Sequence, residues 1–461
     1  MTTMRDRVRV GRSPLAPVLV AALLAGPGIV PGIGLAASGG QCAGVESLPG
    51  GWTAGPTPAT ATLPVGEPPT SLVETAVVGQ DPLVALATDG VSVFRTTDRG
   101  CNWQPVFTVG AIDYYSANSL ATGYSVTNIA TGHDVRPANQ QDVYLALSPN
   151  PLNAFSMVTL FGAAPPELLA ASHDGGRTFN VVAPQPSVAN PIVPECLSAP
   201  ALFIVPPTDA KRLYLQCNGG LAQSAAEQEV AGGVSVAFRS SDGGVSWSVI
   251  GLPAVVRYPT DPHWIVPGVQ KDELWLGGYW SSTTAPVHTY IAIWHSRDGG
   301  DTWTRLLPEP KPLPDGAGQT SVGVAVDTAP GPGMGRVVVY THTGTYATAD
   351  LGKHWQRLRA VKFPNGVRVP IAAFFLRHSL YELFGGVITC KADPVFVRYP
   401  TVGARPVTLS YPAKWGKYAG WAADESFAVV SKGVIGSGLA TFCVGNSETP
   451  TVTKLLSLRV G

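Results

Sequence analysis

Five short stretches of this 461-residue chain repeat one pattern, in which a serine or threonine is followed by aspartate, glycine and an aromatic residue at fixed spacing. The clearest is FRSSDGGVSWSVI at 238–250, which has the order S-x-D-x-G-x-x-W. The five aspartates are 76, 68, 56 and 52 residues apart, and such an irregular interval indicates an array of similar units with variable insertions. We number the motifs 1 to 5 in chain order. Their aspartate, glycine and aromatic residues are Asp98, Gly100 and Trp103; Asp174, Gly176 and Phe179; Asp242, Gly244 and Trp247; Asp298, Gly300 and Trp303; and Asp350, Gly352 and Trp355.

The residues around each motif predict β-strands. In VSVAFRS at 234–240, Val234, Val236 and Phe238 alternate with small or polar residues, which predicts a half-buried strand. Another apolar run lies upstream of nearly every motif, and the chain becomes apolar again after it. Each unit therefore predicts a four-stranded antiparallel sheet once an inner strand is counted.

Two further units without the motif, 367–400 and 418–460, raise the number of units to about seven. We therefore expect an all-β fold, a single β-propeller of about seven four-stranded antiparallel blades. The stretch after Cys42 is expected to complete the last blade, because closing the ring removes edge strands. The one predicted helix covers 221–231.

Each residue type in the motif has a role in a turn between two strands. Aspartate and serine or threonine accept hydrogen bonds from local N–H groups, glycine adopts positive φ, and the aromatic ring buries a large area. A calcium loop would need alternating oxygen ligands, but the residue after the aspartate is arginine, leucine or, three times, glycine. A catalytic role would require five equivalent sites. We therefore interpret the motif as structural.

The motif resembles the Asp-box, or BNR repeat, of the sialidase-like β-propellers, a superfamily that includes sortilin-type receptors, xyloglucanases and photosystem II assembly factors. The resemblance covers roughly residues 70–360 by motif and the remainder by strand pattern. It implies that each motif lies between the third and fourth strands of a blade, away from the central site. The chain departs from the pattern at Phe179 and Leu351, and its last two units lack the motif.

The first 36 residues have the features of a Sec-type signal peptide, which predicts export to the extracellular space or the cell envelope and leaves 37–461 as the propeller domain. Four arginines between 5 and 12 precede a long stretch without charge, and Gly34-Leu35-Ala36 suits cleavage near Ala36. An uncleaved membrane anchor is the alternative. No later stretch is long and apolar enough to span a bilayer.

Charge and composition narrow the possible partners. The chain has 31 Lys+Arg and 31 Asp+Glu, and it carries no basic stripe, so we expect no nucleic-acid binding. We expect a protein or glycan partner and a monomeric chain. Six cysteines in an exported chain predict disulfides, and our preferred pairs are Cys196–Cys217, Cys390–Cys443 and Cys42–Cys101, although six cysteines allow 15 pairings.

Catalytic signatures are weak. The F/Y-R-I-P motif of sialidases has its nearest match at Val367–Pro370, which follows motif 5 and so lies at the wrong place in the ring. We predict no metal site and no cofactor, because the chain has no H-E-x-x-H and its glycine-rich stretches do not join a strand to a helix. A glycosidase would need two carboxylates about 5–9.5 Å apart. The candidates in expected loops are Asp113 (beside Tyr114 and Tyr115), Glu195, Asp261, Asp272, Glu273, Asp424 and Glu425.

Two groups of aromatic residues favour binding, since rings on loops at a propeller face stack on sugars or hold a protein segment. Our leading hypothesis is an exported binding or assembly module for proteins or glycans. The alternative is a glycoside hydrolase of sialidase-like fold, and a scaffold for a membrane or envelope complex is a third possibility. The candidate binding residues are Trp264, Tyr279, Trp280, Trp415, Tyr418 and Trp421.

Overall fold

The computed structural model shows an all-β chain, and the compact unit that contains the described strands is Gln41–Gly461. No helix in the part of the chain that the structure describes is long and apolar enough to cross a membrane. The predicted helix at 221–231 lies outside the described residues. The described residues are 46–47, 52–56, 58, 74–78, 84–98, 100–109, 124–131, 141–149, 168–182, 202–206, 209, 211–217, 236–253, 265–281, 288–308, 312, 322–329, 331–341, 344–359, 361, 370–376, 378–384, 395–401, 404–409, 414–415, 418–423, 429–430, 434–444 and 452–459.

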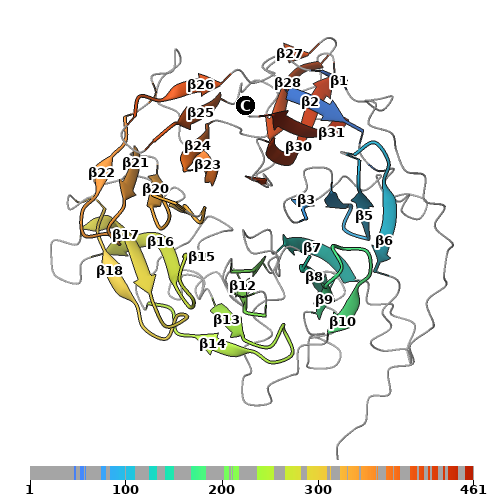
Figure 1. Cartoon of the computed structure of the whole chain (residues 1–461). Coiled ribbons are helices and arrows are strands. Elements are labelled where there is room, and N and C mark those ends of the chain that lie inside the picture. The colour runs from blue at the N-terminus through green and yellow to red at the C-terminus, as the bar shows by residue number, and fades with distance from the viewer. Residues whose placement is uncertain are drawn as a thin grey trace, which may run out of the picture. The chain divides into compact units, whose positions relative to one another are not determined.

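The described strands form six four-stranded sheets and one seven-stranded sheet, and all strand pairs are antiparallel. In the six smaller sheets the strands pair in chain order (Figure 1). Sheet 1 contains β3 (Glu74–Val77), β4 (Ala85–Thr88), β5 (Ser92–Thr96) and β6 (Gln104–Thr108); sheet 2 contains β7 (Tyr124–Thr131), β8 (Val143–Pro149), β9 (Leu168–Ser172) and β10 (Asn180–Val182); sheet 3 contains β11 (Leu202–Ile204), β12 (Leu213–Cys217), β13 (Val236–Ser240) and β14 (Ser248–Ile250).

The next three sheets follow the same plan. The motifs lie between the third and fourth strands of sheets 1 to 5, and sheet 6 has no motif. Sheet 4 contains β15 (Ile265–Pro267), β16 (Leu274–Ser281), β17 (Thr289–Ser296) and β18 (Thr304–Leu306); sheet 5 contains β19 (Gly323–Val326), β20 (Val337–Thr341), β21 (Gly344–Thr348) and β22 (Gln356–Arg357); sheet 6 contains β23 (Pro370–Leu376), β24 (Ser379–Phe384), β25 (Val395–Tyr399) and β26 (Val407–Leu409).

Sheet 7 joins strands from both ends of the chain. β2 (Trp52–Gly55) pairs with β31 (Val452–Arg459), so the stretch after Cys42 completes the last sheet, as predicted from the sequence. This pairing covers an edge of β31 that would otherwise be open. The other strands of sheet 7 are β1 (Glu46–Ser47), β27 (Lys414–Trp415), β28 (Tyr418–Ala423), β29 (Val429–Val430) and β30 (Val434–Val444).

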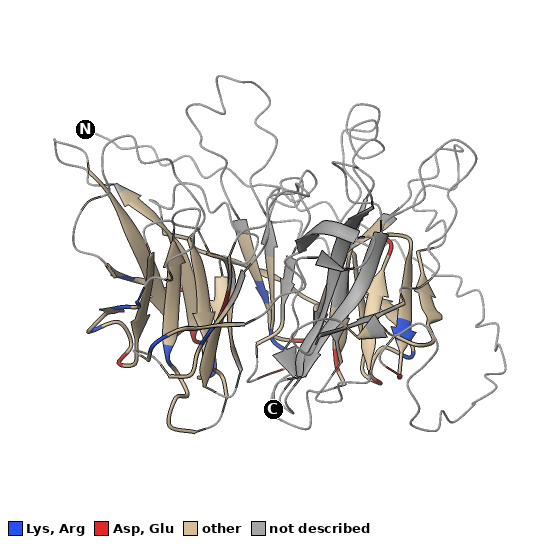
Figure 2. Cartoon of the chain, turned by 90° about the horizontal axis from the view of Figure 1, so that it is seen from above, with Lys and Arg blue, Asp and Glu red and all other residues tan. Residues whose placement is uncertain are grey.

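The seven sheets succeed one another around a ring (Figure 1). Separate hydrophobic clusters lie between sheets 1 and 2, 2 and 3, 3 and 4, 4 and 5, and 5 and 6. β23 contacts β29, and β30 contacts β3, so sheet 7 connects sheet 6 back to sheet 1. A ring of antiparallel sheets closed in this way is a β-propeller. Figure 2 shows the strands side-on, with many of the described charged residues gathered toward one end of the sheets.

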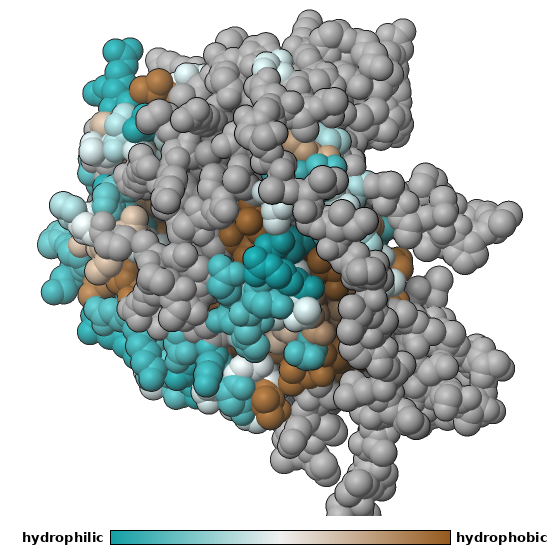
Figure 3. All heavy atoms as spheres, turned by 45° about the vertical axis from the view of Figure 1, so that its right-hand side comes forward, coloured by the Kyte–Doolittle hydropathy of each residue, from teal (hydrophilic) through white to brown (hydrophobic). Residues whose placement is uncertain are grey.

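The strands are more buried than the alternating pattern predicted. In β13, Ala237 is 0% exposed although it alternates with Phe238, which is 6% exposed. Each sheet packs between two neighbouring sheets, so both of its faces lie in a core, and the expectation of a half-buried strand was wrong for this reason. The exposed large apolar residues among those described are Val181, Val245, Val249, Met334 and Val407. Figure 3 shows hydrophobic and hydrophilic residues mixed over the described part of one face.

Candidate functional site

The five motifs adopt one hydrogen-bonding pattern. The serine or threonine hydroxyl donates to Oδ1 of the aspartate at 2.8 Å in all five, and it accepts a bond from the glycine N–H at 2.8–3.0 Å. The backbone N–H four residues after the aspartate also donates to Oδ1, at 2.8–3.0 Å. One aspartate thus satisfies several donors that a tight turn leaves without partners.

The second carboxylate oxygen of each motif aspartate is also occupied. The side chain four residues later donates to Oδ2 in every motif, at 2.5–2.7 Å, and the donors are Asn102, Thr178, Ser246, Thr302 and His354. In Asp174 and Asp298, burial alone would raise the pKa, but bonds from these side chains and from the backbone outweigh it and lower the pKa to about 2. The motif aspartates are therefore ionised acceptors whose oxygens are already engaged.

The glycine and aromatic positions of the motif hold neighbouring sheets together. Gly244 has φ +90°, and a Cβ there would overlap the side chain of Leu169 in sheet 2. The indole N–H of Trp303 donates to the backbone oxygen of Gly251, which follows β14 of sheet 3, at 2.8 Å, and that of Trp103 donates to the backbone oxygen of Pro56, which follows β2 of sheet 7, at 3.0 Å. Motifs 1, 3 and 4 thus contact the preceding sheet.

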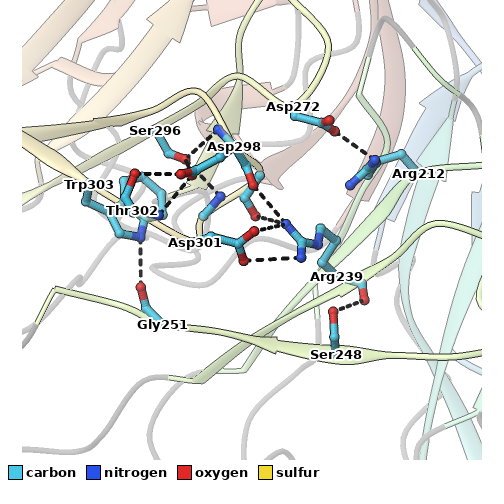
Figure 4. Close-up of polar contacts among 12 residues, drawn as sticks. Arg212, Arg239, Ser248, Gly251, Asp272, Ser296, Asp298, Asp301, Thr302 and Trp303 are labelled. Carbon is cyan, nitrogen blue, oxygen red and sulfur yellow. Dashed lines mark hydrogen bonds and ion pairs between the residues drawn. The ribbon is translucent and has the colours of Figure 1, made fainter.

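An arginine directly before the motif reaches the following sheet. Arg239 donates to the backbone oxygens of Asp298 and Gly299 in motif 4, at 2.9 and 3.1 Å, and forms an ion pair of 3.2 Å with Asp301 (Figure 4). Arg95 does the same for motif 2, donating to the oxygen of Gly175 at 2.8 Å. The sequence analysis missed these contacts, and the available signal was the shared F-R before motifs 1 and 3.

Motif 5 departs from the pattern at Leu351, which has φ +61°. The corresponding Gly175, Gly243 and Gly299 have φ of +76°, +76° and +73°, so the leucine adopts a backbone conformation that suits glycine. Leu351 is partly buried against the cluster between sheets 4 and 5. This packing opposes the conformational cost of the position.

Two candidate acids of the glycosidase hypothesis lie in the described residues, and both are engaged. Asp272 forms an ion pair of 2.9 Å with Arg212. Glu273 is 4% exposed and accepts bonds from the N–H groups of Val269 and Gln270, at 2.9 and 3.0 Å, and it lies 3.0 Å from Nε2 of His295. Burial opposes ionisation of Glu273, but the bonds from His295 and the backbone lower its pKa. The other candidates, Asp113, Tyr114, Tyr115, Glu195, Asp261, Asp424, Glu425 and residues 367–369, lie outside the described residues.

The sequence analysis also missed two buried acids near the contact of sheets 5 and 6. Asp327 is 0% exposed and lies 2.7 Å from the Arg336 guanidinium and 2.9 Å from Nδ1 of His378. Glu382 is also 0% exposed, and burial raises its pKa to about 7 although the hydrogen bond from Thr345 favours ionisation. Neither residue lies in a recognisable motif.

The aromatic residues predicted to form a binding surface have different environments in the structure. Tyr279 is 1% exposed and packs in the cluster between sheets 4 and 5, so its place on a binding surface was wrong. Trp280 points to the other face of the same strand and is half-buried. The Arg305 guanidinium lies 3.6 Å from its ring centroid, and the Tyr290 ring lies 5.2 Å away. Trp264 lies outside the described residues, and only the backbone of Trp415, Tyr418 and Trp421 is described, in β27 and β28.

The cysteine and metal predictions are only partly addressed. Cys101 is disulfide-bonded. The pairings Cys42–Cys101, Cys196–Cys217 and Cys390–Cys443 stay predictions, because Cys42, Cys196 and Cys390 lie outside the described residues. Among the residues that the structure describes, no three His, Cys, Asp or Glu side chains are grouped to hold a metal ion.

Comparisons with known proteins give low similarities. No protein-family model and no curated protein sequence matches the chain. Among solved structures, YCF48 bound to a D1 peptide has a TM-score of 0.46 and 12% identity over 91% of this chain and 98% of that one. The GH74 xyloglucanase from Xanthomonas campestris has a TM-score of 0.45 and 14% identity over 86% of this chain and 52% of that one. The β-propeller domain of the Trilobed protease from Pyrococcus furiosus has a TM-score of 0.43 and 8% identity, over 83% and 92%. The assignment as a β-propeller therefore rests on the sheet order of the chain itself.

Proposed function

We propose that this chain is an exported, seven-bladed Asp-box β-propeller that binds a protein segment or a glycan. The observation that carries this proposal is the cluster of Trp280, Tyr290 and Arg305 in sheet 4, which we call the Trp280 cluster. It combines two half-buried aromatic rings with an exposed cation, and such groups stack on sugar rings and hold peptide side chains. Trp280 also packs against the hydrophobic cluster between sheets 3 and 4.

The position of the Trp280 cluster fits a binding role. Trp280 and Tyr290 are paired residues near the ends of β16 and β17, whereas motif 4 follows the opposite end of β17. The motif end is occupied by contacts between sheets, including those of Arg239. The paired residues Trp280 and Tyr290 lie at the end of sheet 4 away from those contacts, and the guanidinium of Arg305, which lies in β18 two residues after Trp303, extends to the Trp280 ring.

The glycosidase alternative has less support among the described residues. Asp272 and Glu273 are adjacent in sequence, but the first is paired with Arg212 and the second is enclosed with His295. A general acid or nucleophile needs a carboxyl group that reaches the substrate. Neither carboxyl group is arranged in that way.

Binding and turnover can be measured on the same purified protein. We expect binding to a glycan array or to a displayed peptide library, with no hydrolysis of fluorogenic sialosides and neutral glycosides. Trp280→Ala should weaken binding to the selected ligand at least about tenfold, the loss expected when a central aromatic contact is truncated. Arg357→Ala is the matched control, because Arg357 lies 5.9 Å from the Tyr346 ring at the corresponding place in sheet 5. Turnover that disappears when one loop Asp or Glu is replaced would favour the glycosidase instead.

Export by the segment 1–36 is part of the same proposal. If it is correct, the protein recovered from outside the cytoplasm should begin near residue 37. N-terminal sequencing of that material tests this. A secreted or envelope protein that retains Met1 would indicate an uncleaved anchor.

A further inference from the structure

Arg305 in the Trp280 cluster is a charged group whose described partner is an aromatic ring. Its guanidinium carbon lies 3.6 Å from the centroid of the Trp280 ring, and the residue is exposed. Arg239, by contrast, forms an ion pair of 3.2 Å with Asp301 and donates to backbone oxygens of motif 4. No described carboxylate forms an ion pair with Arg305. Its positive charge is therefore presented to solvent.

The register of sheet 4 explains how Arg305 reaches this ring. Arg305 pairs with Trp294 of β17, and Trp280 of β16 pairs with Tyr290, which lies four residues before Trp294 on the same face. Ala292 is the residue between them on that face, and it is 0% exposed. A small side chain at this place leaves room for the long arginine side chain to lie along the sheet.

The ring under the guanidinium is held in place by its own packing. Trp280 packs against the hydrophobic cluster between sheets 3 and 4, and the centroid of the Tyr290 ring lies 5.2 Å from that of Trp280. Contact with a fixed ring restricts the arginine side chain before any ligand binds. A side chain restricted in this way loses less conformational freedom on binding.

The groups that Arg305 leaves available determine the chemistry of the ligand. A guanidinium is always charged, and when it lies over an aromatic ring its N–H groups can still donate to a carboxylate, two at a time. The same contact covers a face of the Trp280 ring, and a sugar needs an open aromatic face on which to stack. The cluster therefore suits an acidic side chain better than a neutral sugar ring.

We propose that the Trp280 cluster binds an acidic peptide, and that the guanidinium of Arg305 holds an aspartate or glutamate side chain of that peptide. This inference rests on the proposed function, since it names the ligand of the same cluster. Trp280 positions the guanidinium, and the peptide carboxylate accepts its N–H bonds.

Peptides selected from a displayed library on the purified protein test the proposal. We expect them to share an aspartate or glutamate. A labelled peptide of the selected sequence is then titrated by fluorescence anisotropy. Arg305→Gln, and replacement of the peptide acid by its amide, should each weaken binding at least about tenfold. The two changes together should weaken it little further, because both remove the same ion pair. Arg297→Gln is the matched control, since Arg297 is an exposed arginine of motif 4, at the opposite end of β17 from Tyr290.

The outcomes separate this proposal from the binding function on which it rests. If Trp280→Ala weakens binding but Arg305→Gln does not, the cluster binds its ligand without the ion pair and the proposal is wrong. If neither variant weakens binding, the cluster is not the binding site and the proposed function fails too. Selection of an acidic glycan in preference to every peptide would overturn the peptide assignment. The amide peptide is tested on the wild-type protein, so this result does not depend on the folding of a variant.

A carboxylate of the chain itself is the remaining competitor for Arg305. Glu309 lies four residues later in the sequence, outside the described residues. Glu309→Gln should leave the affinity for the acidic peptide unchanged. A gain in affinity would show that Glu309 already occupies the guanidinium, and it would overturn the proposal.

Discussion

The hydroxyl of Thr345 in sheet 5 donates a hydrogen bond of 2.6 Å to Oε1 of Glu382 in sheet 6. Glu382 has no exposed surface, and its other oxygen, Oε2, has no hydrogen-bond partner within 3.5 Å. Burial raises the pKa of this carboxyl from 4.5 to about 7, so between these two pH values the group is protonated in the folded protein and ionised in the unfolded chain. Folding is therefore coupled to proton binding at the contact of sheets 5 and 6.

Stability should fall as pH rises through the range set by Glu382. The folded pKa lies above the unfolded value, so the contribution of the protonated group is complete below pH 4.5 and is lost as pH rises through 7. The loss is about 3 kcal/mol in the free energy of unfolding. Glu382→Gln should remove most of this dependence and make the protein more stable than the wild type at pH 8. Urea unfolding at pH 5, 6, 7 and 8 measures the free energy of unfolding of both proteins, and Asp301→Asn, at an exposed position, is the control. An unchanged pH slope in Glu382→Gln would contradict the assignment.

The motif aspartates should contribute to stability through their hydrogen bonds. Asp298 accepts bonds from the Ser296 hydroxyl and from the N–H and hydroxyl of Thr302. Asp298→Ala should lower the free energy of unfolding by about 1–2 kcal/mol, as the loss of a helix-capping side chain does. Asp301→Ala, three residues away, removes a 57% exposed partner of Arg239 and should cost less than about 1 kcal/mol. Equal losses in the two variants would mean that the motif bonds contribute no more than a surface ion pair.

The repeated local features were predictable from the sequence. The motif residues contact one another within a few positions of the chain, so their spacing alone predicts both the turn and its bonds. The same holds for the strand that precedes each motif, which β17 illustrates at Thr289–Ser296. The closing pair of β2 and β31 followed from the number of units and from the cost of an open edge.

Contacts between sheets could not be predicted in the same way. His378 meets Asp327 across 51 positions of sequence, and Arg239 meets Asp301 across 62. Which of these residues meet is determined by the packing of one sheet against the next, and a local sequence pattern does not predict that packing. Tyr279 shows the same limit, because it and Trp280 are adjacent in sequence but point to opposite faces of β16. The face that packs on sheet 5 buries the tyrosine.

The pH dependence of Glu273 should have the opposite sign to that of Glu382. Its folded pKa is lowered, so its ionised form contributes stability above its unfolded pKa, and that contribution is lost as pH falls through the folded value. Glu273→Gln should reduce the free energy of unfolding at pH 7 by about 1–3 kcal/mol, because the charged acceptor for Val269, Gln270 and His295 is removed. Unfolding between pH 3.5 and 7 should also show a smaller loss on acidification than in the wild type. If Glu273→Gln lost as much stability on acidification as the wild type, another group would be responsible for the acid dependence.

Two neighbouring glycines of motif 3 allow the backbone and packing effects of the motif to be separated. Gly243 and Gly244 both have positive φ, +76° and +90°, so alanine at either should cost about 1–2 kcal/mol in backbone strain. A Cβ at Gly243 meets no atom within 4 Å, whereas a Cβ at Gly244 overlaps the side chain of Leu169 in sheet 2. Gly244→Ala should therefore lower the free energy of unfolding by about 1–3 kcal/mol more than Gly243→Ala. Urea unfolding of both variants measures the difference. Equal values would show that the motif 3 turn acts only through its own conformation and that its contact with sheet 2 adds no measurable stability.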